Sequence, residues 1–279
     1  MKSAGSVESY IIIGKVKKLI DTHCHIYLPE FSEDLEQTVQ RALLAGIDRM
    51  FLPNVNCETY ADMMAVCDRW PDLCFPMIGL HPEDLAQDYH SQLDWMKDIL
   101  DRDQSGPRRI VGIGETGIDL HWDTTRLDEQ LDSFRVQAGW ALEYGLPLVI
   151  HCRDAQEELW NAVSGFRGTG LKGIFHCFSG SESDAARLME LEGFMFGIGG
   201  TLTYKKSALP EAIRDIPRER IVLETDCPYL PPVPFRGKRN EPSFMVHTAS
   251  FLAQLWDCNE EQVCAITRQN ALSLFGMEQ

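Results

Sequence analysis

The segment Leu19-Ile20-Asp21-Thr22-His23-Cys24-His25 is an apolar run that ends in two ionisable side chains. Runs of the same kind, each rich in Val, Ile, Leu or Phe, recur at 49–54, 74–81, 110–116, 147–152, 173–178, 194–199 and 221–226. Short strands that are apolar on both faces are typical of a parallel sheet covered by helices. Together with the first segment, these runs make eight predicted strands.

The segments between these runs carry helical patterns with start and stop signals. We predict helices at 32–45, 127–144, 181–192, 243–255 and 260–275. Ser32 and Asn259 are the expected N-caps. Three of the expected helix ends are followed by Gly46, Gly145 and Gly193. Strands that alternate with helices predict βα units and parallel pairing.

Eight such units in 279 residues predict an α/β fold of the (β/α)8 TIM-barrel type, because barrels of this kind commonly have about 250 residues. A doubly wound open sheet is the alternative. Its dinucleotide-binding form is disfavoured, because no Gly-x-Gly-x-x-Gly follows the first strand. We expect one barrel domain at 19–279 and an N-terminal extension at 1–18 that is either an ordered segment or a loose tail.

The composition is that of a globular protein, with 44% hydrophobic and 24% charged residues. No apolar run approaches the ~20 residues that a membrane helix needs. The nine cysteines include no Cys-x-x-Cys pair and are expected to be free thiols, so we predict a cytoplasmic protein. A net charge of −16 argues against non-specific coating of nucleic acid. It does not exclude local binding of a nucleic-acid end, since bound divalent cations would reverse the field inside a site.

Five predicted strands that are otherwise apolar end in ionisable side chains. At the ends of the first, fourth, fifth, sixth and eighth strands stand His23 and His25, Glu115, His151, His176, and Asp226. Burying such groups one by one would cost several kcal/mol each. A shared metal centre removes that cost, and the C-terminal ends of the strands are where barrel enzymes place catalytic groups. The alternative, a set of independent polar residues, needs a separate explanation for each strand.

Four histidines and two carboxylates exceed the ligand number of one tetrahedral ion. We therefore expect two divalent cations, about 3.5–4 Å apart, with Glu115 as the bridge. A mixed nitrogen and oxygen set suits Zn, Mn or Fe better than Mg, although Mg stays an alternative. Asp226 is expected to bind a cation and to take the proton of the attacking water as general base. Glu115 and Asp226 are thus the predicted catalytic carboxylates of a metal-dependent hydrolase.

Two further carboxylates lie near these positions in the sequence. Asp21 either holds an imidazole ring by accepting a hydrogen bond or is a buried group bonded to the backbone. Glu224 is expected to line a lower layer of the barrel rather than to take part in the chemistry.

Six motifs follow one another along most of the chain: IDTHCH (20–25), GIGETGID (112–119), PLVIHCRDA (147–155), FHCFSG (175–180), LETDCPYL (223–230) and RGKRNEP (236–242). In this order they resemble the motifs of the TatD-type metal-dependent hydrolases, the TatD deoxyribonuclease family. The resemblance implies a TIM-type barrel, a dinuclear divalent-metal site held by the six residues named above, and nuclease activity on DNA that is often exonucleolytic. Some relatives are credited with removing D-amino acids from tRNA, so the family does not fix one substrate. Tyr27 departs from the pattern, since many members carry Asp or Asn there, and the segment before Lys18 has no counterpart.

A phosphodiesterase needs cationic or amide donors for the phosphate oxygens that do not react. The candidates for contact with the substrate are His81, Arg153, Arg236, Lys238 and Arg239. We expect Arg153 and Arg239 to contact phosphate rather than to pair with acidic side chains. Tyr204 and Phe235 are candidates for stacking an unpaired base, with a packing role as the alternative.

The substrate is open to three hypotheses. A metal-dependent deoxyribonuclease, with DNA as the nucleic-acid partner, predicts release of nucleotides from DNA ends. A barrel hydrolase that acts on an aminoacyl ester, another ester or an amide would have a similar site, but the basic loop would then be incidental. A catalytically weak metal-binding or scaffold protein is disfavoured by the complete set of ligand positions. No membrane partner is expected, and the sequence does not indicate an oligomeric state.

Overall fold

The computed structural model describes residues 18–104 and 109–277, which form a (β/α)8 barrel. Eight parallel strands pair with their neighbours in chain order. They are β1 (Leu19–Asp21), β2 (Ile47–Leu52), β3 (Cys74–Ile78), β4 (Gly112–Asp119), β5 (Leu148–Arg153), β6 (Gly173–Phe175), β7 (Phe194–Ile198) and β8 (Ile221–Leu223). Apart from Lys18, the predicted extension lies outside the described residues.

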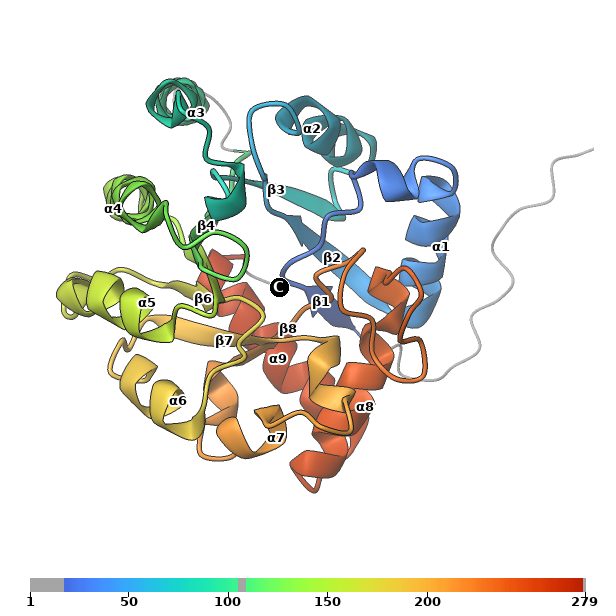
Figure 1. Ribbon diagram of the computed structural model, residues 1–279. Coiled ribbons are helices and arrows are strands. Elements are labelled where there is room, and N and C mark those ends of the chain that lie inside the picture. Colours follow the sequence, from blue (N-terminus) through green and yellow to red (C-terminus); the bar gives the residue numbers. More distant parts are fainter. Residues whose placement is uncertain (1–17, 105–108, 278–279) are drawn as a thin grey trace, which may run out of the picture.

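Helices surround this ring of strands, as Figure 1 shows. The helices are α1 (Leu35–Ala45), α2 (Tyr60–Arg69), α3 (Tyr89–Gln104), α4 (Leu127–Tyr144), α5 (Gln156–Val163), α6 (Glu182–Leu188), α7 (Leu209–Ala212), α8 (Met245–Leu255) and α9 (Glu260–Phe275). Within the described ranges, no helix is both long and apolar enough to cross a membrane.

The barrel closes between β1 and β8 through backbone hydrogen bonds just beyond the two strands. The N–H of Thr22 donates to the carbonyl of Leu223 at 3.1 Å, and the N–H of Asp226 donates to the carbonyl of His23 at 2.9 Å. Two predicted metal ligands are therefore joined through their own backbones at the C-terminal mouth of the barrel.

The interior of the barrel is a separate apolar layer beneath the mouth. Six strands each contribute one buried side chain to it, from Ile20, Phe51, Met77, Val149, Ile174 and Val222. The end of α9 closes this layer, where Phe275 stacks on Phe51 with ring centroids 3.8 Å apart. A larger apolar core lies between the strands and the surrounding helices. The polar side chains at the mouth of the barrel therefore lie directly above a packed apolar layer.

Two helix boundaries follow the predicted signals closely. α4 ends at Tyr144, because Gly145 adopts a left-handed conformation, with φ of 65°, that most residues avoid. α9 begins after Asn259, whose side chain accepts a hydrogen bond from the N–H of Gln262. In return, the side chain of Gln262 accepts one from the N–H of Asn259, which completes a capping box.

Other boundaries differ from the prediction. α1 begins at Leu35, and the hydroxyl of Ser32 donates to the carbonyl of Pro29 instead of capping the helix. α6 ends at Leu188, before the predicted end at 192. Most strands are shorter than the apolar runs, because the last residues of those runs leave the sheet to form the mouth. β4 instead continues to Asp119.

Asp21, the last residue of β1, joins the two strands at which the barrel closes. It is fully buried and accepts hydrogen bonds from the N–H and the hydroxyl of Thr225, at 3.0 and 2.6 Å. It also accepts one from the N–H of His23 at 3.3 Å. Asp21 is thus a buried group bonded largely to the backbone, the second of its two interpretations.

We expect the Asp21→Ala variant to lose about 3 kcal/mol of unfolding free energy, because three buried donors would lose their acceptor and each such loss costs about 1–3 kcal/mol. Urea denaturation followed by circular dichroism measures the change. Glu33→Ala, at an exposed position, is the control and should stay within about 0.5 kcal/mol of the wild type. Equal midpoints for Asp21→Ala and the control would show that these hydrogen bonds do not stabilise the closure.

Candidate metal centre

All six predicted ligands converge at the C-terminal mouth of the barrel. They are His23 and His25 just after β1, Glu115 in β4, His151 in β5, His176 directly after β6, and Asp226 in the loop after β8. Four of them are buried, and the side chains of Asp226 and His151 are 14% and 16% exposed. These two are therefore the members that meet solvent.

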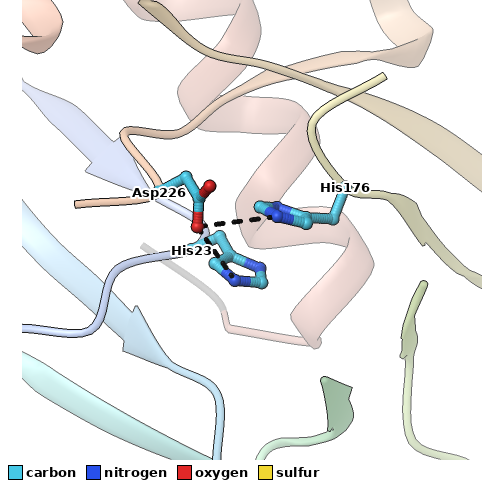
Figure 2. Close-up of side chains that lie close together, drawn as sticks. All are labelled: His23, His176 and Asp226. Carbon is cyan, nitrogen blue, oxygen red and sulfur yellow. Dashed lines mark ion pairs between the residues drawn. The ribbon is translucent and has the colours of Figure 1, made fainter. Parts of the chain in front are cut away.

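The first part of the cluster surrounds Oδ1 of Asp226. The Nε2 atoms of three imidazoles lie 3.6–3.7 Å from this oxygen, in His23, His25 and His176. The rings of His23 and His176 are stacked with centroids 3.4 Å apart (Figure 2). The Nε2 atoms of His23 and His25 are only 3.0 Å apart. Three ring nitrogens and a carboxylate oxygen thus point to a common place.

Glu115 connects this group to a second one. Its Oε2 lies 3.0 Å from Nε2 of His23. Its Oε1 lies 2.8 Å from Nδ1 of His151 and 3.5 Å from Nε2 of His81. The two oxygens of one carboxylate therefore face different imidazoles, which is the arrangement expected of a residue that bridges two cations.

His81, a predicted substrate contact, lies beside this second group. Its Nδ1 accepts a hydrogen bond from the N–H of Glu83 at 3.2 Å, so the neutral ring carries its proton on Nε2. That Nε2 lies 3.4 Å from Nδ1 of His151. His81 thus presents a donor to the mouth, and its contact with substrate stays a prediction.

Tyr27, the departure from the family pattern, orients His25. The phenol of Tyr27 donates to the carbonyl of Pro53 at 2.6 Å, so it accepts the hydrogen bond that joins it to Nδ1 of His25 at 2.9 Å. When the imidazole of His25 is neutral, it therefore carries its proton on Nδ1 and directs the lone pair of Nε2 into the cluster. Sequence reasoning assigned no role to Tyr27, because nothing in its spacing indicates a contact with the ring.

Two carboxylates contact the ring nitrogens of His176 and His151 that point away from the centre of the cluster. Oε1 of Glu224 lies 3.0 Å from Nδ1 of His176, and Oδ2 of Asp119 lies 2.8 Å from Nε2 of His151. The prediction that Glu224 only lines a lower layer is therefore wrong. A Cβ atom at position 197 would lie 2.2 Å from Oε2 of Glu224, so Gly197 leaves the room that this carboxylate occupies.

The electrostatics of the cluster attract positive charge. Burial opposes the charged form of Glu115, but His23, His81 and His176 outweigh it and hold the pKa of Glu115 well below its usual range. Burial, reinforced by His176, lowers the pKa of His23 to about 4. For His151, burial is outweighed by Asp119 and Glu115, which raise its pKa to about 10. The carboxylates thus favour a positive charge on His151, whereas burial favours the neutral form of His23.

The chemistry of the donors fits divalent cations. Imidazole nitrogens and carboxylate oxygens make up three overlapping sets of possible metal ligands, which share His23 and Glu115. Within each set the ligand atoms lie within 4.8 Å of one another. The sets are His23, His176 and Asp226; His23, His25 and Glu115; and His81, Glu115 and His151. The buried Nε2 atoms of His23 and His25 face each other at 3.0 Å. Two neutral rings that both direct lone pairs there would repel, and a shared cation removes the repulsion.

We expect Glu224→Gln to weaken metal binding by about 10- to 100-fold, as is typical when the partner of a ligand imidazole is changed. The amide keeps the size of the side chain but loses the charge that faces Nδ1 of His176. Titration of chelator-treated protein with Mn²⁺ measures the affinity. Glu182→Gln, at an exposed position in α6, should bind as the wild type does. Wild-type affinity in Glu224→Gln would remove Glu224 from the account of the site.

The guanidinium of Arg239 is paired with an acidic side chain and is not free. It donates to both carboxylate oxygens of Asp34, at 2.6 and 2.9 Å, and to the carbonyl of Glu30. The Arg239 guanidinium, aided by Arg41, holds the pKa of Asp34 well below its usual range. The pairing of Arg239 with Asp34 differs from the expected contact with phosphate. It arises because the loop after β8 folds back on the start of α1, where the carboxylate of Asp34 lies.

Two other basic side chains that were predicted to contact substrate lie over aromatic rings. The guanidinium carbon of Arg236 lies 4.3 Å from the ring centroid of Tyr204, and Nζ of Lys238 lies 5.6 Å from that of Phe235. Arg153 stands at the end of β5, two positions beyond His151, and is exposed. Among the basic side chains predicted to contact substrate, Arg153 is the one closest in sequence to a predicted metal ligand. The contacts of these three residues with substrate stay predictions.

The family model described as "TatD related DNase" matches residues 20–276. The chain belongs to the TatD-related DNase family. The match covers the positions of the six predicted ligands, and it makes this TatD-family protein a metal-dependent hydrolase. It is similar to the uncharacterized metal-dependent hydrolase YabD of Bacillus subtilis, with 36% identity over 258 residues, 92% of this chain and 98% of YabD.

Two further comparisons agree with this membership. The chain is 32% identical over 263 residues to a protein of a Rahnella species named 3'-5' ssDNA/RNA exonuclease TatD, which covers 89% of this chain and 94% of the relative. The crystal structure of YjjV, a TatD homologue of Escherichia coli, superposes with a TM-score of 0.85 at 30% identity, over 94% of this chain and 100% of YjjV. The TatD-family barrel predicted from the sequence is thereby confirmed.

Proposed function

We propose that this TatD-family hydrolase is a metal-dependent exonuclease that cleaves phosphodiester bonds of DNA. The observation that carries the proposal is Glu115, whose two oxygens face two groups of imidazoles at one mouth of the barrel. Two divalent cations, with Zn, Mn and Mg as candidates, suit such a ligand set. Relatives named 3'-5' ssDNA/RNA exonucleases support a nucleic-acid substrate and attack from an end.

The side chains at the mouth divide the chemistry among them. When bound, the cations lower the pKa of a water molecule and polarise the scissile phosphate. Asp226 accepts the proton of the attacking water, since its carboxylate touches the ligand imidazoles and is 14% exposed. His81 donates from Nε2 to a phosphate oxygen, and Arg153 supplies a positive charge at the rim. Asp119 and Glu224 keep two imidazoles in position.

An end-labelled assay tests this function. Single-stranded and duplex DNA, labelled at either end, are incubated with chelator-treated protein to which Zn²⁺, Mn²⁺ or Mg²⁺ is added. We expect mononucleotides to be released progressively from one end, with little activity before an ion is added. Asp226→Asn protein, purified in the same way, controls for contaminating nucleases.

Other outcomes separate the proposal from its competitor. Parallel reactions contain an aminoacyl ester and a simple carboxyl ester at the same concentrations of ions. Hydrolysis of an ester without any cleavage of DNA would overturn the proposal and favour a barrel hydrolase for aminoacyl or other ester bonds. Cleavage within DNA that leaves both ends intact would overturn the exonucleolytic part alone.

A further inference from the structure

Trp122 is a large aromatic side chain that the fold leaves in solvent at the rim of the barrel. It lies in the loop between β4 and α4, and 76% of it is exposed. The guanidinium carbon of Arg153 lies 5.6 Å from its ring centroid, and the ring of His121 meets it edge-on at 4.6 Å. The exposed indole offers a flat π face at the rim on which an unpaired base can stack.

The loop that carries Trp122 is attached to the metal centre. Asp119 accepts a hydrogen bond from the N–H of His121 at 2.9 Å through Oδ1, while its Oδ2 lies 2.8 Å from Nε2 of the ligand His151. The N–H of Leu120 donates to the carbonyl of Arg153 at 3.0 Å. The indole and the guanidinium are therefore held by the same two strands, β4 and β5, that carry Glu115 and His151.

Arg153 is a free positive charge in an acidic protein. Among the described residues, no carboxylate lies within ion-pair distance of its guanidinium, and the carboxylates of its chain neighbour and of its cross-strand partner have other contacts. Asp154 pairs with Nδ1 of His121 at 2.7 Å, and Asp119 pairs with His151. The planar guanidinium suits a phosphate group, which it can contact with two parallel N–H donors.

The two aromatic residues named from the sequence as candidates for stacking a base, with packing as the alternative, are engaged in packing. The ring of Phe235 is stacked on Phe244 with centroids 3.9 Å apart and an interplanar angle of 7°. The hydroxyl of Tyr204 donates to the carbonyl of Pro231 at 3.0 Å, and the residue is partly buried. Both are packing residues, whereas Trp122 combines exposure with a neighbouring unpaired cation.

We propose that Trp122 and Arg153 form a nucleotide subsite in which the indole stacks on an unpaired base and the guanidinium binds an adjacent phosphate. The inference rests on the proposed nuclease function. It narrows the substrate to nucleic acid with an unpaired base beside the scissile bond, such as a single strand or a frayed end. Stacking on an aromatic side chain tolerates every base, because each base has a π face.

The test compares two short single strands of equal length, one with ordinary bases and one with abasic residues at both ends. We measure kcat/KM for each with Mn²⁺. The wild type should prefer the base-bearing strand, and Trp122→Ala should reduce that preference about tenfold or more. Trp122→Phe, which keeps an aromatic face, should restore most of it. Trp95→Ala, a change in α3 at a residue that packs on Tyr60, is the matched control and should keep the wild-type preference.

A preference that is unchanged in Trp122→Ala, or an equal loss on both strands, would overturn the subsite while leaving the nuclease function standing. If the wild type cleaves neither strand, the proposed function fails, and tryptophan fluorescence then decides the subsite. Quenching by the base-bearing strand that is present in the wild type and lost in Trp122→Phe supports stacking on Trp122. Equal quenching in both proteins, or none in the wild type, overturns it.

Discussion

Replacing Asp226 by Asn is expected to lower kcat by about 100- to 10,000-fold while the barrel stays folded, which is the range for loss of a general base. The amide cannot accept the proton of the attacking water, and it is a neutral ligand where a charged one stood. The backbone of Asp226 has a positive φ of 56°, which Asn tolerates almost as well as Asp. Steady-state kinetics on end-labelled DNA, together with thermal unfolding, measures both properties.

Asp257 provides a matched control for this change. It is an exposed aspartate with a similar backbone, at a φ of 49°, so Asp257→Asn makes the same chemical change under the same conformational demand. It should retain wild-type turnover and stability. Turnover in Asp226→Asn within a factor of about three of the control would remove Asp226 from the chemistry.

Glu115→Gln is expected to reduce metal affinity by more than about 100-fold, and turnover with it, since changes to outer partners of ligands already cost 10- to 100-fold. Glu115 is the side chain that faces both groups of imidazoles, through Oε2 toward His23 and Oε1 toward His151. An amide offers one weak oxygen ligand and no charge, so it cannot bridge two cations. Calorimetric titration of the chelator-treated variant with Zn²⁺ or Mn²⁺ measures the loss.

Glu211→Gln, at an exposed position in α7, is the control and should bind and turn over as the wild type does. If Glu115→Gln binds the same number of ions with unchanged affinity, Glu115 is not the bridge. The two groups of imidazoles would then act independently.

The sequence was informative about the fold wherever the local signal was unambiguous. Gly145 and Asn259 define the limits of α4 and α9, because a left-handed glycine and a capping box act through the backbone of a few neighbouring residues. The ends of β1, β6 and β8 were misplaced, because the apolar pattern continues into segments that have left the sheet. Where a strand ends depends on pairing with its neighbours, which the periodicity of one segment does not contain.

At the site, the convergence of the six predicted ligands could be anticipated from the sequence, whereas the contacts of the neighbouring carboxylates could not. Each of the six predicted ligands interrupts an apolar run, which is a strong local signal. Asp119 lies beyond the predicted end of its strand at 116 and was not singled out, and Glu224 was expected to line a lower layer of the barrel. Their contacts with His151 and His176 depend on packing between strands far apart in the chain. Arg239 was assigned to phosphate because its partner, Asp34, lies in a different part of the sequence.

Six side chains from the ends of five strands are proposed to hold a pair of cations at one end of the barrel. The most direct test is the metal content of the purified wild-type protein, measured by inductively coupled plasma mass spectrometry after saturation with an ion and removal of the excess. We expect two equivalents of a divalent metal per chain, lost on chelation together with turnover and regained with it. Protein that retains no divalent metal, yet hydrolyses its substrate at the full rate in the presence of chelator, would contradict the account.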